Sequence, residues 1–114
     1  MTYPNNLIQL IDIAFAEVNN FVAKSKYYNG DEEIIKNVKK ALCLLKEEVQ
    51  HHYENINERV LRAMHDLGIA SFKYFENTTL ENAINNITEQ LYNEIPIYKG
   101  LQPLRGDFGK GCPI

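Results

Sequence analysis

Apolar residues recur at every third or fourth position along most of the chain, and this spacing restricts the fold more than any other sequence feature. The first stripe predicts a helix from about Pro4 to Tyr28, ended by Asn29-Gly30 because glycine accepts the left-handed conformation common after a last turn. The apolar positions of this stripe are Leu7, Ile11, Phe15, Val18 and Val22, with Leu10, Ala14 and Phe21 beside them. Since an apolar helix face must be buried against other elements, the spacing predicts a helical bundle.

A second stripe follows Asp31, a residue that suits the N-cap of a helix. Two interpretations remain open for residues 32–67: one unusually long helix, or two helices with a break near His52–Asn57. Asn55 with Glu58 three residues later resembles a capping pair, and helices in globular proteins rarely exceed about 20 residues, so we favour the break. The apolar positions are Ile35, Val38, Leu42, Leu45 and Val49, continued by Tyr53, Ile56, Val60, Met64 and Leu67.

The next segment starts after Gly68, which is predicted to close the preceding helix. Residues 69–75 are rich in aromatic side chains and suit either a short helix or an extended, packed connector. Thr78 and Glu81 then form the pattern of a capping box, which predicts a last helix that ends before Pro96.

The composition changes abruptly over residues 96–114, where prolines and glycines become frequent. This composition predicts an irregular tail, and its apolar residues favour packing of the tail on the bundle. A chain of 114 residues suits one domain. Residues 1–114 are therefore predicted to form a single all-α domain, an irregular bundle of three to five helices with an ordered, irregular C-terminal tail.

Charge and composition restrict the classes of partner. The net charge is −3, whereas direct binding to nucleic acid usually requires an excess of Lys and Arg to contact phosphates. Two cysteines are few for a secreted disulfide scaffold and favour a reducing compartment. The sequence contains no signal-peptide pattern and no apolar run near the roughly 20 residues that cross a bilayer. We therefore expect a cytoplasmic protein without a nucleic-acid or membrane partner.

Residues with reactive side chains do not form a known catalytic pattern. Glu48 and His51 have the spacing of a carboxylate–histidine pair in di-iron bundles, but those proteins carry two such pairs and two further glutamates. Cys43 lies between two leucines and is predicted to be buried. We expect no enzyme, no metal and no cofactor; a metal-dependent helical enzyme that uses Glu48 and His51 is a remaining alternative.

A small, acidic, helical chain with interleaved Asn, Glu and Tyr residues and a Gly/Pro-rich tail resembles bacterial immunity proteins. The likeness is closest to those of contact-dependent growth-inhibition systems. It implies that the protein binds and inhibits the C-terminal toxin domain of a cognate effector, often a nuclease, in the cytoplasm of the producing cell. No residue is carried over from that family. The alternative from another class is a homodimeric helical regulatory or scaffold module without catalytic activity.

Five residues are candidates for binding a toxin. Electrostatic complementarity accelerates association with a basic partner, so Glu47, Glu54 and Glu58 are predicted to supply charge, with the last two one helical turn apart. Tyrosine is favoured at the centres of interfaces. Tyr98 and Asp107 in the tail are predicted to make contacts.

Overall fold

The computed structural model describes residues 5–24 and 31–101, which form four α-helices and two short 3₁₀ helices. The α-helices are α1 (Asn5–Lys24), α2 (Asp31–His52), α3 (Glu58–Tyr74) and α4 (Thr79–Glu94). The 3₁₀ helices are η1 (Tyr53–Asn55), between α2 and α3, and η2 (Pro96–Gly100), after α4. No strand occurs in these two described ranges, and the prediction of an all-α bundle is confirmed.

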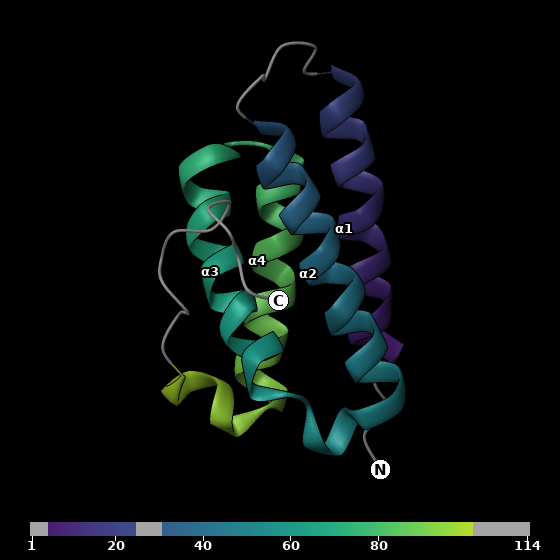
Figure 1. The fold of residues 1–114 in the computed structure, drawn as a ribbon, viewed down its shortest axis with the longest axis vertical. Coiled ribbons are helices and arrows are strands. Elements are labelled where there is room, and N and C mark those ends of the chain that lie inside the picture. Colours follow the sequence, from purple (N-terminus) through teal and green to yellow (C-terminus); the bar gives the residue numbers. More distant parts are fainter. Residues whose placement is uncertain (1–4, 25–30, 102–114) are drawn as a thin grey trace.

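Successive helices run in opposite directions, so the bundle has an up-down-up-down arrangement (Figure 1). α1 packs against α2 and α4, and α3 packs against the same two helices. η1 and η2 both lie at the end of the bundle where α2 and α4 finish (Figure 1). η1 and η2 therefore form part of the surface at this end of the bundle. None of the helices within the described ranges has the length and apolar character to cross a membrane.

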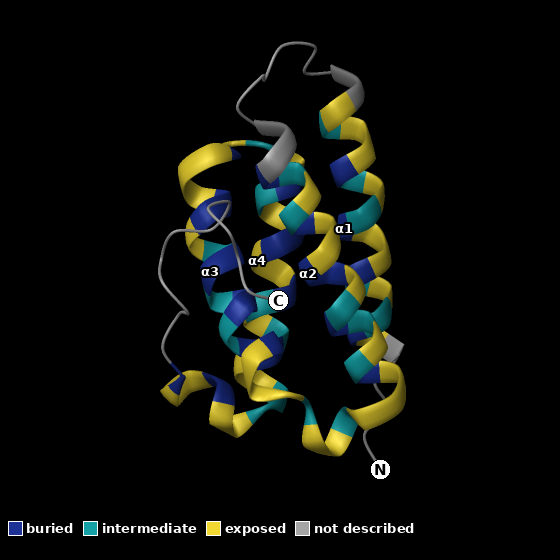
Figure 2. Cartoon of the chain, in the orientation of Figure 1, coloured by how far each residue is buried: buried dark blue, intermediate teal, exposed yellow. Residues whose placement is uncertain are grey.

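Each helix contributes one apolar face to a shared core, and Figure 2 shows the buried positions facing inward. The predicted stripes supply most of this core, although Val22 is exposed and Ile35 is only half-buried. In α2 the buried positions include Ile34 and Ala41 instead, so the true stripe is rotated slightly from the predicted one. The fully or nearly fully buried residues of α1 and α2 are Leu7, Ile11, Ala14, Val18, Ile34, Val38, Ala41, Leu42, Leu45 and Val49.

The predicted break in the second stripe is present, so residues 32–67 belong to two helices and not to one. After η1, the backbone at Ile56 is extended, and α3 begins at Glu58. One consequence concerns Glu54 and Glu58: they lie in different elements, and they do not form the one-turn pair on a single helix face that the spacing suggested.

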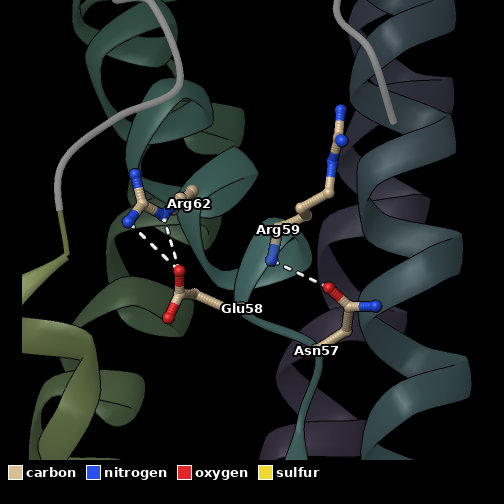
Figure 3. A network of polar contacts seen from close by, with 4 residues as sticks. All are labelled: Asn57, Glu58, Arg59 and Arg62. Carbon is tan, nitrogen blue, oxygen red and sulfur yellow. Dashed lines mark hydrogen bonds and ion pairs between the residues drawn. The ribbon is translucent and has the colours of Figure 1, made fainter.

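The start of α3 is held by side chains on both sides of the connection. Asn57, and not Asn55, is the N-cap: its Oδ1 accepts a hydrogen bond from the Arg59 backbone N–H at 2.8 Å (Figure 3). In return, the Asn57 backbone N–H donates to Glu48 Oε1 of α2, also at 2.8 Å. Glu48 thereby fixes the end of α2 to the beginning of α3.

α3 continues through Gly68 to Tyr74, so the prediction that Gly68 closes a helix is wrong. An interior glycine costs a helix about 1 kcal/mol relative to alanine. Leu67 and Ala70 are buried on either side of it, and burial of such apolar side chains outweighs a cost of that size. Of the two interpretations of residues 69–75, a short helix or an extended connector, the structure shows helix up to Tyr74, but as the continuation of α3 and not as a separate short helix.

The predicted capping box at the start of α4 is confirmed. The Glu81 backbone N–H donates to Thr78 Oγ1 at 3.1 Å, which caps the helix. The return hydrogen bond comes from one residue earlier than usual, because Asn77 N–H donates to Glu81 Oε1 at 3.0 Å. Asn77 has a φ of 65°, a left-handed conformation that asparagine tolerates better than most residues. As predicted, α4 ends before Pro96.

Two further predictions concern Cys43 and the tail. Cys43 is exposed, and the prediction that it is buried is wrong. Neighbouring residues on a helix are about 100° apart, so the burial of Leu42 turns Cys43 away from the core.

The first part of the tail packs on the bundle, with Tyr98 and Leu101 buried. Residues 102–114, which include most of the predicted tail, lie outside the described residues.

Candidate protein-binding site

A groove of about 380 Å³ lies between α3 and α4 and is bordered by exposed apolar side chains. Phe72 of α3 is 66% exposed and Ile69 is 45% exposed, while Tyr92 of α4 is 41% exposed. All three line the groove. Large apolar side chains that remain this exposed, and that gather around one concave surface, are typical of a site for another macromolecule.

Helical spacing explains why these side chains gather. His65, Ile69 and Phe72 are separated by four and three residues, so they share one face of α3 while the core residues occupy the other. On α4, Thr88 and Tyr92 share a face in the same way. The groove between the two helices is therefore walled mainly by α3 aliphatic and aromatic groups on one side and by more polar α4 groups on the other.

Gly68 of α3 lies in the groove wall and, having no side chain, does not fill the groove. It lines the groove, and a Cβ atom built on it would lie 3.7 Å from the Thr88 Cγ2 atom. That distance is an ordinary van der Waals contact, so the helices already approach closely at this level. With glycine at this position, no side chain of residue 68 occupies the space beside Thr88.

Three aromatic rings close one end of the groove. His65 stacks on Tyr98 with ring centroids 3.9 Å apart and an interplanar angle of 7°. Tyr92 meets the Tyr98 ring edge-on, with centroids 5.1 Å apart. The His65 Nε2 lies 2.7 Å from the Tyr98 carbonyl oxygen, and since a carbonyl can only accept, this nitrogen carries the hydrogen. His65 of α3 therefore holds η2 through both the ring and the backbone carbonyl of Tyr98.

Tyr98 occupies a different place from the one predicted. It was expected to contact a partner, yet its side chain is completely buried, because η2 folds back and stacks this ring on His65. Tyr98 supports the end of the groove from within and does not form part of the exposed surface. Its hydroxyl is buried without a hydrogen-bond partner in the described part of the chain, and burial raises its pKa above the ordinary range. Asp107 lies outside the described residues.

A second hollow, of about 580 Å³, lies at the end of the bundle between η1 and η2. Its apolar walls are formed by Ile56, Leu61, Ile95, Pro96 and Ile97, and its polar groups belong to Tyr53, Glu54, Asn55 and Glu94. The Tyr53 hydroxyl donates to one Glu94 oxygen and the Gln90 amide donates to the other. Burial first, and then the hydrogen bond and negative charge of Glu94, raise the pKa of Tyr53 to about 12.

The three predicted acidic residues are all exposed but differ in their surroundings. Glu54 borders the second hollow. Glu58 pairs with Arg62 one turn later on α3, at 3.1 Å, which partly neutralises its charge (Figure 3). Glu47 lies on α2, two turns before η1. The structure therefore brings Glu54 and Glu58 to the same end of the bundle as the hollow, and leaves Glu47 on a neighbouring helix.

Glu48 and His51, whose spacing suggested a metal site, do not act as a pair in the structure. Glu48 accepts the hydrogen bond from the Asn57 backbone, and His51 and His52 are exposed with ring centroids 6.4 Å apart. Over residues 5–24 and 31–101, no three His, Cys, Asp or Glu side chains converge in a way that could hold a metal ion.

Sequence reasoning missed Ile69 and Phe72, two exposed apolar residues that line the groove. Both lie in the segment 69–75, for which helix and extended connector remained open, and without a helix phase their direction could not be assigned. The signal was the burial pattern of α3: once Leu67 and Ala70 face the core, Phe72 must face outward. Comparison of the chain with protein-family models, with curated proteins and with solved structures found no match in any of the three.

Proposed function

We propose that this protein is a toxin-neutralising immunity protein, which binds a cognate bacterial toxin domain through the groove between α3 and α4 and inhibits it. The observation that carries the proposal is the exposure of Phe72 and Ile69 beside Tyr92 along one concave surface. An exposed apolar groove is costly in water, and a protein partner that covers it removes that cost.

The composition of the groove suits a protein interface. Aromatic side chains often carry most of the binding energy of an interface, and Phe72 and Tyr92 both line this groove. Asn85 and Thr88 add polar groups at the α4 wall, which can supply hydrogen bonds to a partner. The docked partner would bury the phenyl ring against this mixed apolar and polar surface.

Charge supports a basic partner, and a nuclease domain is the class of toxin that fits best. The chain carries a net charge of −3, and Glu47 and Glu54 are exposed acidic groups near the end of the bundle where η1 lies. Such groups raise the rate of association with a basic surface more than they raise the final affinity. Binding in the cytoplasm of the producing cell, as in contact-dependent growth-inhibition systems, follows from the same proposal.

Co-expression with the product of the gene immediately upstream tests this function. The expected result is a complex that survives purification, in which the toxin's activity on its substrate is lost and cells survive expression of the toxin. If the upstream product is not a toxin, or if its activity is unchanged by a molar excess of this protein, the proposal is wrong.

The same groove also serves the alternative of a homodimeric regulatory or scaffold module, in which a second copy covers Phe72 and Ile69. Light scattering coupled to gel filtration separates the two. A strict monomer at high protein concentration removes the homodimer, and a dimer that Phe72→Ser converts to a monomer favours it.

A further inference from the structure

The hollow between η1 and η2 combines an apolar wall with two carboxylates. Most of its wall is apolar and comes from Ile56, Leu61, Ile95, Pro96 and Ile97. Two carboxylates, those of Glu54 and Glu94, also line it. Within the described residues, no lysine or arginine is among the groups that line this hollow, so its negative charge is not balanced from its own walls.

We propose that this hollow receives an arginine side chain of the protein partner. The partner's identity as a toxin rests on the proposed function, but the chemistry of the hollow does not. An arginine has an apolar stem and a charged, planar head, so the stem packs along the isoleucine and proline walls while the head meets the carboxylates. The volume of about 580 Å³ is large enough to admit an arginine side chain.

Glu94 is positioned before any ligand arrives. Its two carboxylate oxygens accept hydrogen bonds from different donors, the Tyr53 hydroxyl and the Gln90 amide, so the carboxylate plane is fixed from two sides. Each oxygen retains capacity for a second hydrogen bond. A fixed carboxylate suits the two parallel N–H groups of a guanidinium better than the single point charge of a lysine ammonium.

Glu54 supplies the second carboxylate that lines the hollow. It belongs to η1, whereas Glu94 ends α4, so the two carboxylates come from segments that are 40 positions apart in the sequence. Glu54 is exposed, and no hydrogen bond or ion pair involves it among the described residues. It is therefore able to move toward an incoming cation, while Glu94 supplies the fixed contact.

A titration of the isolated protein with N-acetyl-arginine amide, followed by ¹⁵N–¹H NMR, tests the proposal. The matched control ligand is N-acetyl-citrulline amide, which has nearly the same shape but no charge. We expect saturable shifts confined to the backbone amides around η1 and η2, with binding at least about 5-fold weaker for citrulline. Equal binding of the two ligands, shifts located at the groove between α3 and α4, or no saturable shift in the millimolar range would overturn the proposal.

Variants extend the test. Glu54→Gln is expected to weaken arginine binding by about 3-fold to 10-fold, since it removes one of the two charges but no structural hydrogen bond. Glu76→Gln is the control: it changes the net charge equally but lies in the α3–α4 turn, at the other end of the bundle. An equal loss in both variants would mean that net charge, and not the hollow, binds the ligand. The titration needs no toxin, so it can fail while neutralisation holds, and neutralisation can fail while the hollow still binds arginine.

Discussion

His65 and Tyr98 stack face to face although they lie 33 positions apart, and the same imidazole donates a hydrogen bond to the Tyr98 carbonyl oxygen. This double attachment holds η2 against α3. Tyr98 closes one end of the α3–α4 groove, and its neighbour Ile97 lines the second hollow. The attachment therefore separates and shapes both candidate binding surfaces.

Removal of the Tyr98 hydroxyl is expected to stabilise the protein. This oxygen is buried without a partner in the described residues, and an unsatisfied buried hydroxyl costs about 1–3 kcal/mol. Tyr98→Phe keeps the stacked ring, so urea denaturation should show a gain of about 1 kcal/mol in the free energy of unfolding. Tyr98→Ala, which removes the ring as well, should instead lose about 3–5 kcal/mol. A loss of stability in Tyr98→Phe would mean that the hydroxyl has a partner.

Stability is expected to fall as the pH rises above 10, partly through Tyr53. Its pKa is raised from 10.0 to about 12 in the folded state, so the folded state favours the neutral phenol. This contribution is fully present below pH 10 and is lost as the pH rises through 12. Tyr53→Phe should make the decrease shallower without abolishing it, because the raised pKa of Tyr98 acts in the same direction. Denaturation curves between pH 8 and pH 11 measure this; identical slopes in both proteins would contradict it.

The cap of α3 gives a matched pair of asparagine variants. Asn57→Ala should destabilise the protein by about 1 kcal/mol, because it removes the acceptor of the Arg59 N–H. Asn55→Ala is the control, since Asn55 is exposed and does not cap the helix. Thermal unfolding of the two variants compares them directly, and an equal cost in both would place the cap elsewhere.

Gly68→Ala is expected to raise the free energy of unfolding by about 0.5–1 kcal/mol. The residue is inside α3, where alanine is favoured over glycine, and the added methyl would meet Thr88 at an ordinary contact distance. Chemical denaturation measures the change. Destabilisation would show that α3 and α4 have no room for a methyl group between them.

Local patterns in the sequence predicted the elements whose signals are local. The capping box at Thr78 and Glu81 was readable because cap residues act within a few positions of themselves. The break after α2 was also predicted, but from Asn55 and Glu58, whereas Asn57 is the residue that caps α3. The prediction that a helix ends at Gly68 was wrong because the outcome there does not depend on local residues alone. Whether an interior glycine ends a helix depends on what its neighbours bury, and that is decided by the other helices.

The candidate site was less predictable, since it arises where helices meet. Glu54 was found from its charge, but nothing in the sequence placed it beside Glu94 at the far end of α4. Tyr98 was assigned to the surface because tyrosine is common at interfaces, whereas its stacking on His65 buries it. Contacts between residues this far apart follow from packing, which no single stripe encodes.

The affinity of the Phe72→Ala variant for the purified toxin domain tests the central proposal most directly. Ile13→Ala is the matched control, because Ile13 is also exposed (51%) but lies on α1, which does not line the groove. If the groove binds the toxin, isothermal titration calorimetry should show a loss of at least about 30-fold, or about 2 kcal/mol, for Phe72→Ala, and little change for Ile13→Ala. Unchanged affinity in Phe72→Ala, or an equal loss in both variants, would contradict the proposal.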